Sequence, residues 1–323
     1  MGLGYWAVVS GQLADRGEGI HDTHPRLGWA LKPGSTGIHA SPGNFSVTYN
    51  IDSDGLRVVT NRGEARTRIW IFGDSFVFGH GVADADTLAS RMARDWLAPG
   101  IHVVNAGVSG YGIAQQFQRL LELEDRIKPG DLVLFAPTSD DVERTFKSFR
   151  YPAQYLFREK SHGQIEVCPD LQNGALVTAQ LDTPWNHIKA LFYRALLTGR
   201  GLAGLHDVFY PPHALEEART MVELARAAAA KRGARFALVI LPRPEECGTD
   251  GYRADLSGLA FLDIKRFFPV EPREIAAIGF PTDHHWNARG HAIAAEAIVR
   301  TLLERGVLKP GEVVAEAAVN GNR

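Results

Sequence analysis

The sequence predicts an α/β fold, in which a parallel sheet is covered by helices on both faces. Short, continuously apolar segments recur along the chain, at residues 69–72, 101–104, 132–135 and 235–241. Segments with helical spacing of apolar residues lie between and after them, at residues 87–97, 112–127, 214–232 and 286–304. Strands that are apolar throughout are typical of parallel sheets buried between two helical layers.

The order of the elements supports this class. Strand, helix, strand, helix and strand follow one another from residue 69 to residue 135, and helix, strand and helix follow from residue 214. The first strand ends at Gly73, and the run of alanines at 227–230 fits the helix in which it lies. Alternation of strands and helices indicates parallel strands joined by helical crossovers.

Two segments depart from this rhythm. Residues 1–66 are rich in Gly, Pro, Ser, Thr and Asn, and the alternation at 45–51 predicts a half-buried strand. We therefore expect a small β-rich N-terminal appendage at 1–66 before a larger α/β domain at 67–323. Because an unstructured loop as long as 143–210 would be unusual, that stretch is interpreted as an insertion after the third strand, partly helical around 184–199. In an open α/β sheet the carboxyl ends of the strands face the crevice that binds ligands, so this insertion would lie at that crevice.

Composition excludes several classes of protein. The chain has 323 residues, 45% of them apolar and 22% charged, with a net charge of −2. These values exclude disorder as the main description and argue against a nucleic-acid partner. No apolar run approaches the roughly 20 residues of a membrane span, and the first ten residues lack the basic start of a signal peptide. Cys168 and Cys247 are too few for a disulfide framework, although one bridge between them stays possible.

The turn after the first strand carries the first candidate for chemistry. Ser75 lies between that strand and a helix, so its side chain would project into the crevice and its N–H could face an oxyanion. Alternatively, Asp74 or Ser75 merely caps the helix. A second candidate is the glycine-rich loop at 104–112, which allows close backbone approach and offers amide donors. Its spacing does not match a dinucleotide-binding loop.

The third candidate precedes the last helix. In the segment 281–291, Asp283 lies two residues before His285, so the carboxylate could orient the imidazole as a general base. A helix cap formed by Asp283 or Asn287 is the simpler interpretation. A metal site is a further alternative, although its spacing fits no familiar zinc pattern. Its ligands would be Asp283, His284, His285 and His291.

Together, Gly-Asp-Ser at 73–75, the glycine-rich loop and Asp-x-His-Trp at 283–286 resemble the SGNH (GDSL-type) hydrolase superfamily. The resemblance covers about residues 67–142 and 235–305. The bacterial branch with this late motif includes esterases and the O-acetyltransferases that modify exopolysaccharides. The resemblance implies a three-layer, flavodoxin-like α/β/α sheet and an acyl ester or an acylated saccharide or small molecule as substrate. We expect no cofactor and no metal ion.

The resemblance also implies roles for single residues. Ser75 matches the nucleophile, His285 the base and Asp283 its orienting carboxylate, while the N–H groups of Ser75 and Gly107 match oxyanion donors. Asp140 stands where the superfamily usually has a third donor, an Asn. An ionised Asp cannot donate a hydrogen bond. Either Asp140 is protonated, or Ser139 or a backbone amide donates instead, or the protein is not an ordinary esterase.

These residues predict a serine-dependent ester hydrolase that works through an acyl-enzyme. An O-acyltransferase acting on a saccharide or natural product is the alternative, and a catalytically weak binding module with the same fold is a second. Asp74, His284 and Trp286 are expected to bind substrate. With a histidine base, activity should rise through about pH 6–7. The sequence leaves open the acyl group, the acceptor, the compartment and the oligomeric state.

Overall fold

The computed structural model describes residues 19–24, 26–144, 157–161, 164–167, 214–252, 256 and 258–314. The helix expected around 184–199 and Cys168 lie outside these residues. Cys247 is a buried free thiol whose pKa is raised to about 12, chiefly by burial. Within the described ranges, no helix is both long enough and apolar enough to cross a membrane.

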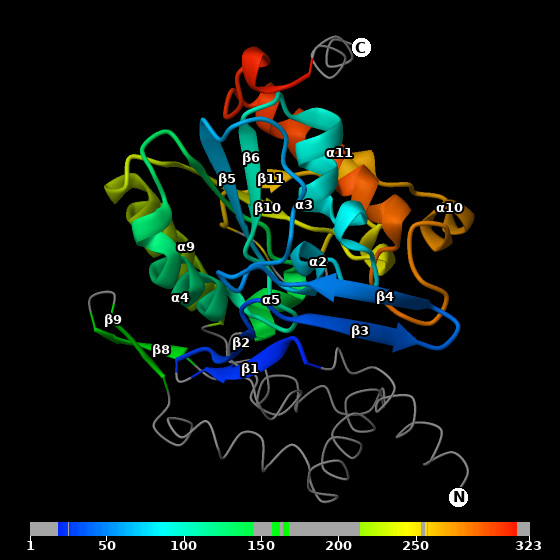
Figure 1. Ribbon diagram of the computed structural model, residues 1–323, viewed down its shortest axis with the longest axis horizontal. Helices are drawn as coiled ribbons and strands as arrows, with labels where there is room; N and C mark the ends of the chain where they lie inside the picture. The colour runs from blue at the N-terminus through cyan, green and yellow to red at the C-terminus, as the bar shows by residue number, and fades with distance from the viewer. Residues whose placement is uncertain are drawn as a thin grey trace, which may run out of the picture.

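A five-stranded sheet forms the centre of the molecule (Figure 1). All its neighbouring strands are parallel, and their spatial order is β11-β10-β7-β5-β6. When the five strands are numbered 1 to 5 along the chain and the sheet is read from the β6 edge, the order is 2-1-3-4-5. This is the flavodoxin-like arrangement. The predicted fold class is therefore confirmed. The strands are β5 (Thr67–Phe72), β6 (Ile101–Asn105), β7 (Leu132–Phe135), β10 (Arg235–Ile240) and β11 (Leu262–Asp263).

Helices cover both faces of this sheet (Figure 1). One layer holds α4 and α9, and the other holds α3 and α11. Shorter helices follow the carboxyl ends of β5 and β7 or precede the last helix. The bounds are α2 (Ser75–Phe78), α3 (Leu88–Arg91), α4 (Ile113–Leu123), α5 (Ser139–Arg144), α9 (Ala214–Lys231), α10 (Pro272–Ala276) and α11 (Ala288–Glu304).

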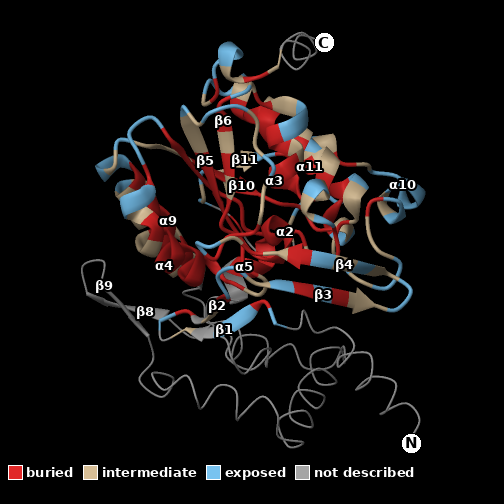
Figure 2. Ribbon diagram, viewed as in Figure 1, coloured by how far each residue is buried: buried red, intermediate tan, exposed pale blue. Residues whose placement is uncertain are grey.

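The side chains of β5 show why its sequence is apolar throughout. Ile69 and Ile71 belong to the hydrophobic cluster under α3 and α11, whereas Trp70 and Phe72 belong to the cluster under α4 and α9. Successive residues of a strand point to opposite faces, so both sets are buried when helices cover both faces. Figure 2 shows the resulting buried centre.

Two helices differ from their expected residue ranges or type, and a helix cap explains one of these differences. The last helix begins at Ala288 because the side chain of Asn287 accepts hydrogen bonds from the N–H groups of Arg289 and Gly290. The segment expected at 87–97 is α3, which continues as a π-helical turn, Met92–Trp96. Thr87 caps α3 by accepting from the Ser90 N–H.

The N-terminal region forms two antiparallel hairpins at the carboxyl edge of the sheet (Figure 1). The strand expected at 45–51 is part of the second hairpin, as β4. A further hairpin lies in the segment that was interpreted as an insertion. The six strands are β1 (His21–His24), β2 (Gly28–Leu31), β3 (Thr36–Ser41), β4 (Phe45–Asn50), β8 (Phe157–Ser161) and β9 (Gln164–Val167).

A buried arginine attaches the second hairpin to the rest of the molecule. Arg57 is 1% exposed and forms an ion pair with Asp84 at 2.6 Å. Its guanidinium lies over the rings of Tyr49 in β4 and Phe78 in α2, 4.1 and 4.8 Å from their centroids. Burial lowers the pKa of Arg57 to about 10, but the group stays charged at neutral pH. Cation–π contacts and the ion pair thus hold the hairpin against α2.

The loop after β6 approaches α2 so closely that it requires glycine. A Cβ at position 107 would lie 2.5 Å from the backbone nitrogen of Phe78 and 2.7 Å from Val77 Cγ1. We expect Gly107→Ala to lower the free energy of unfolding by about 1–3 kcal/mol because of this overpacking. Chemical denaturation measures the change. Gly311→Ala is the control, since nothing lies within 4 Å of its added Cβ; equal stabilities for the two variants would contradict the prediction.

Candidate active site

Ser75 is the first residue of α2, directly after the turn that follows β5. The Asp74 side chain caps this one-turn helix by accepting from the Phe76 N–H at 2.9 Å. At Gly73 an added Cβ would lie 2.2 Å from a methyl carbon of Val77 and 2.7 Å from the Ala136 carbonyl oxygen. Glycine therefore allows the turn to pass close to β7, and the turn places Ser75 at the carboxyl edge of the sheet.

A tight loop before α11 presents the imidazole. Asn287 donates its side-chain amide to the carbonyls of Ala277 and Gly279, at 3.0 and 2.9 Å, and its backbone N–H to Ile278. The Phe280 N–H donates to the His285 carbonyl at 3.2 Å. These bonds close the loop at residues 279–287 and fix the direction of the side chains at 283 and 285.

The structure brings Ser75, His285 and Asp283 together. Ser75 Oγ lies 2.7 Å from His285 Nε2, across 210 positions of sequence. His285 Nδ1 lies 2.5 Å from Asp283 Oδ1, and the same oxygen accepts the His285 backbone N–H at 2.8 Å. A hydroxyl, an imidazole and a carboxylate in this sequence of bonds are the parts of an activated serine nucleophile.

The electrostatic surroundings favour a neutral imidazole beside an ionised carboxylate. Burial is the main factor that lowers the pKa of His285, and the neighbouring His80 lowers it further, while Asp283 opposes the shift. Burial alone would raise the pKa of Asp283, but the hydrogen bond from His285 and the neighbouring His80 imidazole hold it well below its usual range. His285 can therefore accept a proton at neutral pH, and Asp283 remains its negative partner.

Sequence patterns did not reveal two supports of this site. Asn44, in the β3–β4 turn, exchanges hydrogen bonds with Thr282: its amide donates to Oγ1 at 2.9 Å and its carbonyl accepts the backbone N–H at 3.0 Å. His80 lies with its ring against that of His285, at a centroid distance of 4.2 Å. Both contacts join residues that are distant in the chain, so no local pattern could have indicated them.

The N–H of Gly107 already donates a hydrogen bond, which argues against its expected role as an oxyanion donor. Its N–H donates to Asn105 Oδ1 at 3.1 Å, and Asn105 donates its amide to the Val77 carbonyl at 2.8 Å. This arrangement joins the loop after β6 to α2. The Ser75 N–H, in contrast, makes no hydrogen bond within the part of the chain that the structure describes.

Asp140 requires a correction. It accepts a close hydrogen bond from the Arg243 guanidinium and is 4% exposed. Because Asp140 acts as an acceptor and its charge is balanced by Arg243, it is neither the expected oxyanion donor nor a protonated substitute for Asn. The Ser139 hydroxyl is no substitute either, since it donates to Glu246 Oε1 at 2.5 Å.

Two of the three expected substrate-binding residues also require correction. Asp74 is fully buried, caps α2 and faces the Thr138 hydroxyl at 3.5 Å. Trp286 is likewise fully buried, because adjacent residues of an extended loop point in opposite directions and His285 faces the crevice. The Trp286 ring packs on Phe76 and Phe268, with centroids 4.8 and 5.3 Å away. For Asp74 the simpler interpretation, a helix cap, holds, and Trp286 is a residue of the hydrophobic core.

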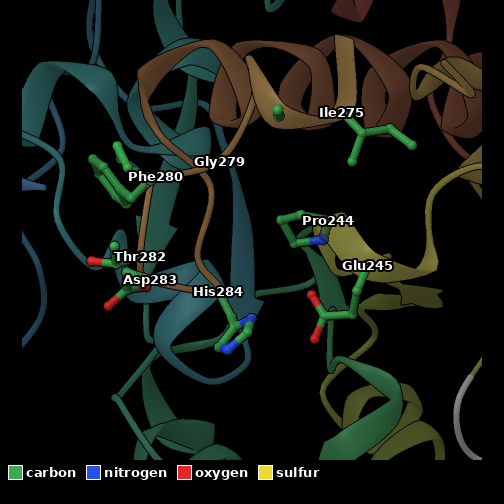
Figure 3. Close-up of a pocket in the computed structure, with 10 residues that line it drawn as sticks. Pro244, Glu245, Ile275, Gly279, Phe280, Thr282, Asp283 and His284 are labelled. Carbon is green, nitrogen blue, oxygen red and sulfur yellow. The ribbon is translucent and has the colours of Figure 1, made fainter. Parts of the chain in front are cut away.

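His284 lines a pocket of about 300 Å³ beside the motif (Figure 3). Its imidazole and the Glu245 carboxylate extend from opposite sides of the opening, with Pro244 and Ile275 above them (Figure 3). Asp283 is among the lining residues but Ser75 and His285 are not, so the pocket adjoins Asp283 without enclosing the serine hydroxyl. Its volume is at the small end of ligand sites.

The possible metal ligands are not the set that the sequence suggested. His80, Asp283 and His285 place one ligand atom each within 4.8 Å of one another. His291 is 1% exposed within α11, and burial is the main factor that lowers its pKa to about 3. Because both nitrogens of His285 already face Ser75 and Asp283, the hydrogen-bonded arrangement fits these residues better than a metal centre.

Comparison with protein-family models gives no match, and comparison with curated proteins gives none. Solved structures are similar to this chain, and one of the three described next carries the G-D-S-L name of the superfamily that the motifs resemble. One is a member of the lipolytic protein G-D-S-L family from Veillonella parvula DSM 2008, with 12% identity, coverage of 74% of this chain and 97% of that chain, and a TM-score of 0.40. The others follow.

An α/β hydrolase from the metagenome of Lake Arreo, Spain, shares 18% identity, with coverage of 74% of this chain and 95% of that chain and a TM-score of 0.41. A catalytic mutant of an acetylxylan esterase from Geobacillus stearothermophilus shares 15% identity, with coverage of 76% and 97% and a TM-score of 0.39. Likenesses of this level transfer no substrate and no mechanism. Those depend on the residues of this chain itself.

Replacing Asp140 by Asn tests the corrected role. Asp140→Asn removes the buried negative partner of Arg243, so we expect the free energy of unfolding to fall by about 1–3 kcal/mol. Denaturant titration measures it, with Asp125→Asn as the control. Asp125 forms an ion pair with Arg232, but its side chain is 88% exposed, so this change should have little effect. If Asp140→Asn is as stable as the parent protein, the buried pair is not important for the fold.

Proposed function

We propose that the protein is a serine ester hydrolase that transfers an acyl group from an ester to Ser75 and then to water. The observation that supports this proposal most is the unbroken series of hydrogen bonds from Asp283 through His285 to Ser75. A neutral imidazole bonded to a serine hydroxyl is the arrangement that activates such a nucleophile. A carbohydrate or a small molecule that carries an acyl ester is the proposed substrate.

In the proposed reaction, Ser75 Oγ attacks the ester carbonyl while His285 Nε2 takes its proton. Asp283 accepts the Nδ1–H, which fixes the tautomer and stabilises the imidazolium. The negative oxygen of the tetrahedral intermediate faces the Ser75 N–H, which the fold leaves without a partner among the described residues. When the carbon–oxygen bond of the ester breaks, the alcohol leaves with the proton from Nε2.

The second half of the reaction uses the same groups. His285 takes a proton from a water molecule as that water attacks the acyl-serine, and returns it to Ser75 Oγ when the acid leaves. If a sugar hydroxyl replaces water, the product is a new ester and the protein is an O-acyltransferase.

Ser75→Ala tests the nucleophile. We expect kcat for hydrolysis of p-nitrophenyl acetate to fall by about 10⁴-fold, because the variant cannot form the acyl-enzyme. The matched control is Ser90→Ala: Ser90 is 2% exposed within α3, and its hydroxyl has no hydrogen-bond partner among the described residues. Labelling of the parent by a fluorophosphonate, with none on Ser75→Ala, gives a second measurement. Equal turnover by Ser75→Ala and the parent would exclude this mechanism.

The pH profile tests the base. Neutral His285 is the active form, and burial lowers its pKa below the ordinary value of about 6.5. The plot of kcat/KM against pH should therefore lose activity on the acid side through an inflection below about pH 6.5, lower than the sequence alone suggested. Hydrolysis rates between pH 4 and 8 measure it. An inflection above pH 7 would contradict a buried neutral imidazole.

A further inference from the structure

His80 lies close to Ser75 because of the turn that ends α2. Gly79 adopts a left-handed conformation, with φ of 89°, directly after the last residue of the helix. The N–H groups of Gly79 and His80 both donate to the Ser75 carbonyl at 3.0 Å. This pattern is a common helix C-terminal motif. It fixes the backbone of His80 relative to the nucleophile.

The His80 side chain faces the Asp283–His285 pair. Its ring lies 30° from parallel with that of His285, and its Nε2 is 3.5 Å from Asp283 Oδ2. The other carboxylate oxygen, Oδ1, is the one that holds His285. The His80 Nε2 is buried and has no hydrogen-bond partner among the described residues, so Asp283 Oδ2 is the polar atom that it faces. Asp283 thus lies between two imidazoles, one on each oxygen.

The β3–β4 hairpin supports the other side of His80. His39 and Phe45 pack edge-on against its ring, with centroids 4.8 and 5.3 Å away. His39 Nδ1 lies 2.9 Å from the Tyr49 hydroxyl, which accepts the Gly81 N–H at 2.7 Å. A series of aromatic contacts and hydrogen bonds therefore fixes the ring of His80 against the group formed by Ser75, His285 and Asp283.

We propose that His80 is a positioning residue, which holds the Asp283 carboxylate through Oδ2. This inference rests on the proposed function, because it assigns a role within the same site. With its proton on Nε2, the His80 ring directs a donor at Oδ2 and stabilises the carboxylate that orients His285.

The charges around the two imidazoles agree with this role. His80 is the nearest basic group that lowers the pKa of His285, after the effect of burial. Asp283 is the carboxylate that faces both rings, and Asp74 acts on His285 through space. The titratable groups packed around the pair are His39 on β3, Asp74 before α2, Asp283 on the loop and His291 on α11.

Two substitutions separate the donor from the ring. His80→Phe keeps an aromatic ring against His285 but removes the donor. His80→Gln removes the ring and keeps an amide donor near the position of Nε2. His102→Gln is the control, because this histidine bonds to the Gly63 carbonyl at 2.9 Å on β6, away from the site. Thermal unfolding verifies that each variant is folded.

We expect His80→Phe to lower kcat for p-nitrophenyl acetate by about tenfold with little change in KM, and His80→Gln to restore most of it. The pKa of His285, measured by NMR titration of the resting protein, should rise by about half a unit or more in His80→Phe. It should rise less in His80→Gln, which keeps the donor, and stay unchanged in His102→Gln.

Two results would overturn the inference. The first is that both His80 variants keep the kcat and the His285 pKa of the parent protein. The other is an equal loss of kcat in both variants with the His285 pKa unchanged, since a packing role alone would give that result. Failure of the proposed function is seen separately, as absence of fluorophosphonate labelling in the parent, and the NMR titration still measures the coupling of the two histidines in that case.

Discussion

The hydrogen bond between Asp283 and His285 is the interaction on which the rest of the candidate site depends. It defines which imidazole nitrogen is free to face Ser75, and it keeps a negative charge beside a buried ring. The surrounding structure is arranged to hold this pair: Asn287 closes the loop, Trp286 anchors it in the core, and Asn44 holds Thr282 from the N-terminal hairpin. Without these contacts, a short exposed loop would sample many directions for the same two side chains.

Most of the sheet and its helical layers could be predicted because the sequence repeats one physical pattern. A strand segment buried on both faces must be apolar, and β7 and the last four residues of β5 and of β10 show this signal. The two-residue strand β11 is too short to produce a pattern. The start of α11 was misplaced by two residues because Asn287 acts as the cap, and a cap is recognised by its hydrogen bonds rather than by hydrophobic spacing.

The site was predictable where it depends on motifs and not where it depends on packing. The sequence indicated Ser75, Asp283 and His285 together, and the structure brings them into hydrogen-bond distance. The expectations for Asp74 and Trp286 were wrong because a residue next to a functional side chain often points into the core. Asp140 was judged from its own sequence position, whereas its role is determined by Arg243, 103 residues later.

The separation of the nucleophile and the base along the chain has a consequence for biosynthesis. Ser75 and its imidazole partner are 210 residues apart, and the loop that carries His285 directly precedes the last helix. During translation, a nascent chain can form β5 and α2 long before the C-terminal segment leaves the ribosome. The Ser75 hydroxyl is therefore made about 210 residues before the imidazole that lies beside it in the folded protein, and the pair can form only after the segment that carries His285 has been synthesised.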